Sequence, residues 1–382
     1  MMEFIDYTTL KMVWWLLVGI LWLGFAMTEG FDMGVGMLLP FVGKTDEERR
    51  VAINAVAPHW DGNQVWLILA AGAIFAAWPI VYATTFSGFY LALMLMLFSL
   101  FFRPVGFDYR SKLENKKWRS TWDWGLFISG IVPPLILGVA FGNLFLGVPF
   151  HYDDYLRSFY DGNFFGLLHP FAVLSGLLAI SMFVMHGGAY LMMRCGDEVY
   201  NRTRTYTQFA AIAVIALFAI EGLWLWTSID GYALTSEINT GAPANPLGKT
   251  VEIFEGAWLT NYTEYPLTMI APIVGFVAAF GAFLSARARK AGIAFAMTTM
   301  SMFGIILTGA FSLFPFILPS SVNPSHSLTI WDAASSELTL SIMLFATLLF
   351  VPIILIYTVW CYVKLWGKYS VEDIRAKQHS LY

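Results

Sequence analysis

Long apolar runs separated by short polar segments recur along the whole chain. A helix crosses a hydrocarbon core about 30 Å thick with roughly 20 residues, so the pattern predicts an all-α polytopic membrane protein. A transmembrane barrel would instead show short segments of alternating polarity, and no such pattern dominates the chain. Nine membrane-spanning helices are expected, at residues 12–38, 55–77, 80–102, 122–147, 164–193, 205–228, 264–285, 291–315 and 337–364.

The composition is also that of a membrane protein. Of 382 residues, 58% are apolar and 13% are charged, and the mean hydropathy is +0.65. Soluble domains carry about 25% charged residues. The chain has no Pro-rich or Gly/Ser-rich linker, so residues 1–382 are expected to form a single integral membrane domain in contact with lipid. Nothing in the sequence predicts binding to nucleic acid.

Lys and Arg are distributed unevenly between alternate segments. Of the 22 Lys and Arg residues, 18 lie in the segments that follow the first, third, fifth, seventh and ninth expected spans, and Lys364 is the last residue of the ninth span. The positive-inside rule therefore predicts a periplasmic N-terminus and a cytoplasmic C-terminus. A miscounted span would have scrambled this separation, so it also favours nine spans.

A weak internal repeat is present. The motif Ile-Leu-x-x-Ala-Phe occurs at 136–141 and again at 306–311, and in both copies a proline, Pro149 or Pro319, follows the alanine by nine residues. The repeat predicts two four-helix bundles plus one extra helix. The halves would cover residues 10–150 and 164–318, with the extra helix at 337–364.

Two acidic residues lie within the first expected span, towards its cytosolic end. Glu29 and Asp32 are three residues apart, hence on one helical face, and Gly30 and Gly34 beside them allow another helix to approach. An acid at mid-helix costs about 3 kcal/mol on insertion scales, so intramembrane carboxylates indicate a function by default. A structural role is the alternative for this pair.

A second polar group, in the string APHWDGNQVW, begins the second expected span on the cytosolic side. Together the two groups predict a path for protons from the cytosol through Glu29, Asp32, His59 and Asp61. Asp61 could instead be a solvated helix-start residue, and His59 an interfacial or hydrogen-bonded histidine. Supporting roles are expected for Trp60, Asn63, Arg103, Asp108 and Glu221.

Two further alternatives concern Arg103 and the histidines. Arg103, at the cytosolic end of the third expected span, either snorkels to the membrane interface or pairs with a buried acid of the first span. Among the six histidines only His59 and His186 share a depth, so a bis-His haem site between them is the alternative to no metal or haem ligand. No zinc, c-type haem, Walker A or dinucleotide motif is present.

Long strings of the sequence resemble subunit II of the cytochrome bd ubiquinol oxidases. The resemblance extends from the first span to the C-terminus and is carried by WWLLVGILWLGFAMTEGFDMGVGMLLPFVG, APHWDGNQVWLILAAGAIFAAWP, SGFYLALMLMLFSLFFRPVGFDYRSK and the tail ending in HSLY. It implies a bacterial inner-membrane heterodimer that oxidises ubiquinol, reduces oxygen to water and generates a proton motive force.

The resemblance also implies where the cofactors lie. In that family, subunit I ligates low-spin haem b, high-spin haem b and haem d and carries the loop that oxidises quinol. Subunit II is a nine-span scaffold packed against subunit I, so no catalytic residue is expected in this chain. A structural quinone within subunit II and small single-span accessory subunits are further implications of the resemblance.

Proton-path residues carry over from the family at matching positions. Carboxylates of the first two spans are proposed there to lead cytosolic protons towards the oxygen-reducing haem, and they fall on Asp32 and Asp61. The family's Asp-Gly-Phe-Asp is Glu-Gly-Phe-Asp here, so the role of Glu29 carries over less directly. The rival interpretation is a secondary transporter in which Glu29, Asp32 and Glu221 form an ion or substrate site. Helices broken by Gly or Pro in both halves would favour that rival.

Overall fold

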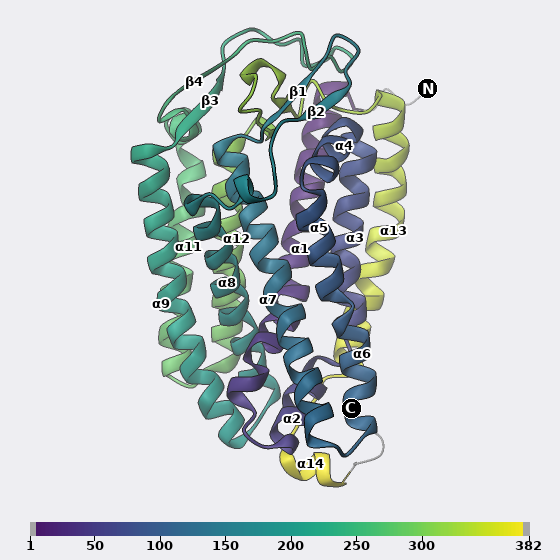
Figure 1. Cartoon of the computed structure of the whole chain (residues 1–382), viewed down its shortest axis with the longest axis vertical. Coiled ribbons are helices and arrows are strands. Elements are labelled where there is room, and N and C mark those ends of the chain that lie inside the picture. The colour runs from purple at the N-terminus through teal and green to yellow at the C-terminus, as the bar shows by residue number, and fades with distance from the viewer. Residues whose placement is uncertain (1–4, 377–382) are drawn as a thin grey trace.

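Helices aligned along one axis make up most of the computed structural model, which describes residues 5–376 (Figure 1). The helices are α1 (Tyr7–Val42), α2 (Asp46–Val56), α3 (Trp60–Ala77), α4 (Pro79–Gly88), α5 (Tyr90–Leu100), α6 (Phe102–Tyr109), α7 (Lys116–Leu146), α8 (Pro170–Arg194), α9 (Asp197–Ser228), α10 (Thr260–Glu264), α11 (Ile270–Arg287), α12 (Ala291–Leu313), α13 (Glu337–Lys364) and α14 (Val371–Ala376). The strands are β1 (Phe150–Tyr152), β2 (Ser158–Tyr160), β3 (Asp230–Leu234), β4 (Val251–Glu255), β5 (Phe316–Leu318) and β6 (Leu328–Thr329).

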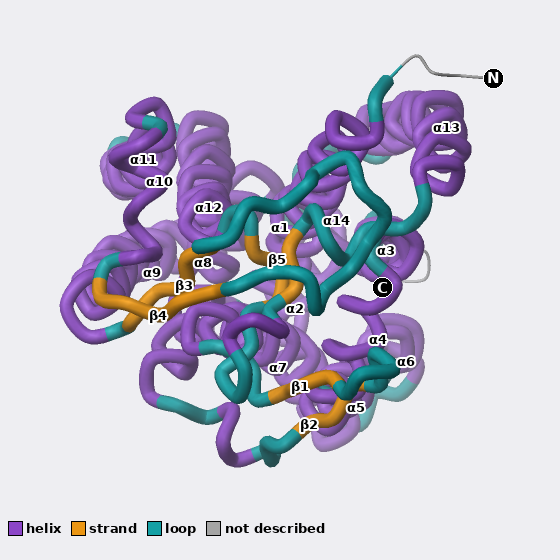
Figure 2. The backbone as a smooth tube through the Cα atoms, turned by 90° about the horizontal axis from the view of Figure 1, so that it is seen from above, coloured by secondary structure: helices purple, strands orange, loops and turns teal. Residues whose placement is uncertain are grey.

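The two ends of the bundle are built differently. Three antiparallel pairs, β1–β2, β3–β4 and β5–β6, cover one end, which we name the hairpin end (Figure 1, Figure 2). Helices α2 and α14 lie at the opposite end, which we name the α14 end (Figure 1). Helix α1 begins at the hairpin end, so the described chain starts and finishes at opposite ends of the bundle. The tail string at 379–382 lies outside the described residues.

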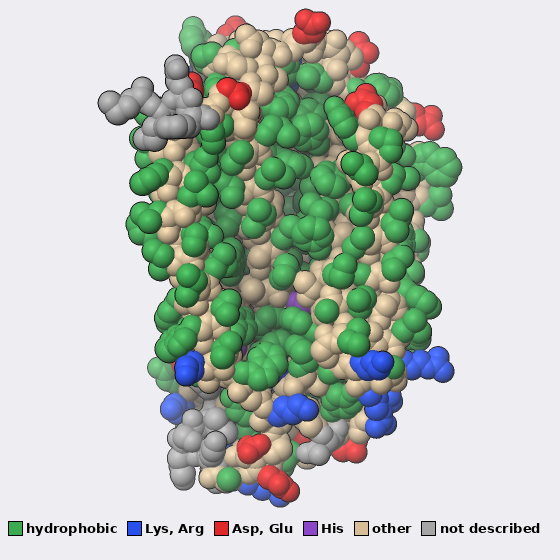
Figure 3. Space-filling model, turned by 180° about the vertical axis from the view of Figure 1, so that it is seen from behind, with side chains coloured by type: hydrophobic (Ala, Val, Ile, Leu, Met, Phe, Trp, Pro, Cys, Tyr) green, Lys and Arg blue, Asp and Glu red, His purple; other side chains and the backbone are tan. Residues whose placement is uncertain are grey.

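Eight helical segments are long and apolar enough to cross a membrane, so the chain is a polytopic helical membrane protein. Helix α3 has 18 residues and is not among the eight, because Asp61, Asn63 and Gln64 in its first turns lower its hydropathy. Hydrophobic side chains cover the middle of the face seen in Figure 3, and Lys and Arg side chains gather towards the α14 end.

The third expected span differs most from the structure. Residues 80–102 were expected as one helix, but α4, α5 and α6 follow one another there, with breaks at Phe89 and Phe101. At the first break the backbone lies against β2, since a Cβ on Gly88 would come within 2.7 Å of the Tyr160 ring. Packing against the hairpin therefore interrupts a run that hydropathy alone reads as continuous.

Helices α1 and α8 cross at unusually close range. A Cβ on Gly34 would lie 2.0 Å from the backbone oxygen of Phe183, and one on Gly187 would lie 2.6 Å from the Gly34 backbone. Only glycine at both positions permits this approach. The crossing brings α1 and α8 together next to Glu29 and Asp32, the two acids of α1.

Gly34→Ala is expected to destabilise the chain by about 1–3 kcal/mol, because overpacking here must push two backbones apart. Thermal unfolding of the purified protein in detergent measures this. Gly292→Ala in α12 is the matched control, since a Cβ there meets nothing within 4 Å. Equal unfolding temperatures for the two variants would contradict the close crossing.

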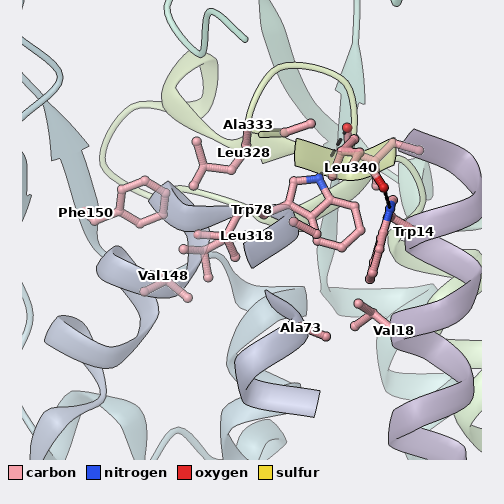
Figure 4. Close-up of a cluster of buried hydrophobic side chains, with 14 of the residues drawn as sticks. Trp14, Val18, Ala73, Trp78, Val148, Phe150, Leu318, Leu328, Ala333 and Leu340 are labelled. Carbon is pink, nitrogen blue, oxygen red and sulfur yellow. Dashed lines mark hydrogen bonds between the residues drawn. The ribbon is translucent and has the colours of Figure 1, made fainter. Parts of the chain in front are cut away.

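A buried apolar cluster holds the last long helix to the first at the hairpin end (Figure 4). The indole Nε1 of Trp14 donates to the backbone oxygen of Leu340 at 3.0 Å, which joins α1 to α13. Trp78, the residue after α3, and Leu318 of β5 pack in the same cluster. The cluster fixes α13 beside α1 and α3, so that the far end of α13 reaches the polar side chains described next.

Candidate functional site

The first acid of α1 is held by an arginine of α6. Glu29 is fully buried and forms an ion pair with Arg103, which is 2% exposed. The guanidinium of Arg103 lies 6.0 Å from the centroid of the Trp60 ring, and that ring stacks on Phe107 at 5.1 Å. Of the two alternatives for Arg103, pairing with a buried acid of α1 is therefore the one found, and Glu29 is a compensated charge.

The second acid of α1 has a different environment. Asn63 of α3 donates through Nδ2 to Asp32 Oδ2 at 2.8 Å, and the hydroxyl of Tyr362 in α13 donates to Asn63 Oδ1 at 2.7 Å. The other oxygen of Asp32, Oδ1, is buried and has no protein hydrogen-bond partner. Asp32 is therefore oriented by neutral groups on one side and unpartnered on the other.

His59, the residue before α3, lies next to Tyr362. Its ring stacks on Tyr362 with 4.1 Å between centroids, and its Nε2 is buried without a hydrogen-bond partner. Burial, and secondarily the positive charge of Arg194, lowers the pKa of His59 to about 4. Burial thus disfavours the charged form of the His59 imidazole.

A small cavity lies beside Asp32 and Arg103. It has a volume of about 10 Å³, and its lining includes Asp32, Arg103, Phe107 and Ser129. A polar cavity of roughly 10–15 Å³ can hold a single water molecule. Asp32, whose Oδ1 has no protein hydrogen-bond partner, therefore borders a space the size of one water molecule.

Three residues expected at the site lie elsewhere. Asp61 is exposed in the first turn of α3, at the α14 end. Val65 and Ile68, one and two turns further along α3, are exposed as well, and the three form an exposed stripe. Asp108 is exposed on α6. Glu221 is half-buried towards the hairpin end of α9, where it accepts a hydrogen bond from Ser175 of α8. The other expected residues, Glu29, Asp32, His59, Trp60, Asn63 and Arg103, come together as described above.

The bis-His alternative does not fit this arrangement. His186 is engaged at both ring nitrogens, by Thr298 Oγ1 and by the backbone oxygen of Met27, each at 2.8 Å. It therefore has no free nitrogen to share with His59 in ligating a haem. Within residues 5–376, no group of three or more His, Cys, Asp or Glu is arranged to hold a metal ion.

Sequence reasoning missed Tyr362. Tyr362 lies near the end of an expected span, where aromatic residues commonly anchor a helix at the membrane interface. Nothing in its position along the sequence indicates a contact with Asn63. That contact arises because α13 lies along α1 and α3 in the folded chain.

Comparison with known proteins covers nearly the whole chain. The family model described as "Cytochrome bd terminal oxidase subunit II" matches residues 10–365. "Cytochrome bd-I ubiquinol oxidase subunit 2" of Escherichia coli (strain K12) is 53% identical over 378 residues, which is 99% of this chain and 100% of that protein. "Cytochrome bd ubiquinol oxidase subunit 2" of Bacillus subtilis (strain 168) is 31% identical, over 92% of this chain and 94% of that protein.

A solved structure shares the fold. A chain of the structure titled "The structure of bd oxidase from Geobacillus thermodenitrificans" superposes with a TM-score of 0.64 at 14% identity, over 94% of this chain and 98% of that one. Because a family model and relatives of 31% to 53% identity match over nearly the full length, this chain belongs to the cytochrome bd terminal oxidase subunit II family.

Proposed function

We propose that this chain takes up protons at the α14 end of its bundle and passes them towards the partner subunit I. As a member of its family, the chain is a subunit of a cytochrome bd ubiquinol oxidase, an oxidoreductase complex of the bacterial membrane. The observation that carries the proposal is Asp32, a carboxyl group 2% exposed, with one oxygen unpartnered beside a cavity of one-water size.

The two acids of α1 suit different tasks. Glu29 is paired with Arg103, and a cation beside a buried acid favours its charged form. Asp32 forms no ion pair with a described Lys or Arg and accepts only from the neutral amide of Asn63. A carboxyl group in such a setting can gain and lose a proton without breaking a salt bridge. We therefore assign proton exchange to Asp32 and a supporting role to Glu29.

We infer nine crossings, with the α14 end in the cytosol. The chain starts and finishes at opposite ends of the bundle, which requires an odd number of crossings, and α3 supplies the ninth beside the eight apolar segments (Figure 1). The segments expected at the α14 end, together with Lys364 at the end of the ninth span, carry 19 of the 22 Lys and Arg residues, as the positive-inside rule requires of a cytosolic face.

We further propose that residues 10–150 and 164–318 are related halves of one domain, with α13 as the extra helix. Val148 and Ser320, each next to one proline of the sequence repeat, form a parallel bridge in which Val148 N donates to Pro319 O at 2.8 Å. Pairing of equivalent segments across a bundle is what an internal repeat with a parallel axis produces.

Family membership implies a subunit I partner and haem cofactors in the complex. We propose that haem b and haem d are held by the partner, where quinol is oxidised, because His186 has no free ring nitrogen here. A structural quinone in this chain and small accessory subunits stay predictions. Purification in mild detergent should yield a haem-coloured complex with a second large subunit; a colourless chain that binds solute would favour a transporter.

Asp61→Asn is expected to slow oxygen reduction about tenfold, equivalent to about 1.4 kcal/mol in the barrier, while haem content stays normal. Asp61 heads the exposed stripe of α3, so its carboxylate can collect protons where a partner would dock. Quinol-driven oxygen consumption and haem absorbance measure the two quantities. Asp154→Asn, in an exposed loop at the hairpin end, is the matched control.

Two results would refute this role of Asp61. Normal turnover of Asp61→Asn over a wide pH range would take the residue off the proton path. Loss of haem along with turnover would mean that Asp61 acts in assembly instead.

A further inference from the structure

Polar atoms without a hydrogen-bond partner gather around the α14 end of α13. They are Oδ1 of Asp32, Nε2 of His59, and both Nε and Nη1 of Arg194, all in side chains no more than 5% exposed. Leaving a buried donor or acceptor unsatisfied costs about 1–3 kcal/mol, so such groups in native proteins bind protein atoms or ordered water. Several of them together, with no protein partner, indicate a hydrated site.

Arg194 is the least expected member of this group. It ends α8 and is fully buried, and no described carboxylate pairs with it. Its guanidinium carbon lies 5.8 Å from the ring centroid of Tyr190, 4.8 Å from that of Trp366 and 5.5 Å from that of Tyr369. Three aromatic faces therefore stabilise a cation that lacks a counter-ion.

The segment that leads from α13 to α14 covers this cation. Arg194 donates from Nη2 to the backbone oxygen of Leu365 at 3.2 Å, and its own backbone oxygen accepts from Tyr369 N at 2.8 Å. Residues 365–369 therefore lie across the end of α8 and separate Arg194 from the solvent at the α14 end.

A continuous aromatic wall connects Arg194 to Asp32. Tyr190 stacks on Phe31 with 4.0 Å between centroids, and Phe31, the residue before Asp32, meets Tyr362 edge-on at 6.5 Å. The Tyr362 hydroxyl in turn donates a hydrogen bond to Asn63, and the Asn63 amide donates one to Asp32. The buried cation and the buried acid are thus connected by one row of contacting side chains.

We propose that Arg194, His59 and Tyr362 line a water-filled path for protons, which opens beneath residues 365–369 and ends at Oδ1 of Asp32. This inference rests on the proposed role of Asp32 as proton acceptor. It adds an uptake path from the α14 end that does not begin at the exposed carboxylate of Asp61.

The chemistry assigns distinct parts to Asp32, to Asn63 with Tyr362, and to Arg194. A proton arrives on Asp32 Oδ1 from a neighbouring water, and that water is reprotonated by the next one along the path. Asn63 and Tyr362 are positioning residues, because an amide N–H does not release its proton at neutral pH; they fix the other oxygen, Oδ2. The unpartnered Nε and Nη1 of Arg194 donate to the waters beside them, and because a buried charge without a counter-ion requires solvation, the charge keeps this part of the path hydrated.

Tyr362→Phe tests the positioning role, since it removes one hydroxyl and keeps the ring against His59. Loss of one such hydrogen bond is expected to lower turnover about three- to tenfold, with haem content unchanged. The pH at half-maximal turnover should also move, which a purely structural change would not cause. Tyr357→Phe, 64% exposed on α13, is the matched control and should behave as wild type.

Arg194 is tested by a charge-keeping and a charge-removing variant. Arg194→Lys is expected to keep at least half of wild-type turnover, and Arg194→Gln to lose about tenfold and shift the half-maximal pH. Arg157→Gln, in the exposed β1–β2 turn, is the control. Equal turnover of the Lys and Gln variants, at full haem content, would overturn the role of the charge.

Radiolytic hydroxyl labelling of the intact complex tests the water directly, because bound water labels the side chains next to it. Tyr190, 1% exposed beside Arg194, should be labelled quickly despite its burial, and Trp258, 1% exposed beside β3, should not. Slow labelling of both would overturn the hydrated path.

Asp32→Asn separates this inference from the function on which it rests. If Asp32→Asn lowers turnover about 100-fold while the Tyr362 and Arg194 variants behave as wild type, only the path beneath 365–369 is wrong. If Asp32→Asn itself turns over normally, the proposed function fails and the path fails with it.

Discussion

Asp32→Asn is expected to lower quinol-driven oxygen consumption about 100-fold, the low end of what a positioned acid or base contributes. Asparagine has nearly the same shape and keeps an oxygen that can accept from Asn63 Nδ2, so the helix contacts should survive. What the variant removes is the group that binds and releases a proton. The effect should therefore fall on turnover, not on haem content or on the amount of folded complex.

The measurement is oxygen consumption by the purified complex over a range of pH, with haem absorbance recorded on the same sample. Asp32→Glu is the graded comparison and should recover part of the rate, because it restores a carboxyl group one methylene out of place. Asp153→Asn, in the β1–β2 turn, serves as a distant control. An unchanged rate for Asp32→Asn at all pH values would take Asp32 off the proton path, and loss of haem would make it structural.

The sequence predicted that Glu29 and Asp32 form a pair of buried acids, but not which of the two is paired with a cation. A spacing of three residues correctly places Glu29 and Asp32 on one face of α1, and both are buried. Which of them is compensated depends on Arg103, which lies 74 positions from Glu29 in the chain and reaches it from α6. Spacing determines a shared face, whereas charge compensation depends on how a distant helix packs.

Tyr362 and Arg194 show a second limit of the sequence. Both lie near the ends of expected spans, where aromatic and basic residues are common as membrane anchors. Nothing in their spacing distinguishes an anchor in lipid from a buried group that contacts Asn63 or stacks under Trp366. The long crossings themselves were predictable, because hydropathy reports directly on transfer into hydrocarbon.

Where the fold departed from expectation, contacts at the hairpin end were responsible. The run at 80–102 is apolar throughout, yet β2 packs against Gly88 and the chain bends into separate helices. The start of α8 was expected at 164 but falls at Pro170, after a 3-10 turn over Phe165–Leu167. Apolar residues in such turns raise hydropathy without extending the helix.

The ion pair inside the bundle gives the second large expected effect. Arg103→Gln leaves the fully buried carboxylate of Glu29 without its counter-charge, and breaking such a pair costs about 3–5 kcal/mol. Glu29→Gln should cost about the same, because it leaves Arg103 as the uncompensated charge. Each single variant is therefore expected to unfold, and to release its haem, at a clearly lower temperature than wild type.

The double variant Glu29→Gln/Arg103→Gln is the decisive comparison, because two amides can hydrogen-bond to each other and neither carries a charge. It should be more stable than either single variant, since a buried pair contributes mostly by avoiding an unpaired ion. Arg375→Gln, which breaks the exposed pair with Glu47, should leave the unfolding temperature unchanged. Additive losses in the double variant would contradict the pairing.

The same double variant tests whether Glu29 takes part in proton transfer. Recovery of both stability and turnover would assign Glu29 a purely structural role. Recovery of stability alone would place its carboxylate on the proton path beside Asp32.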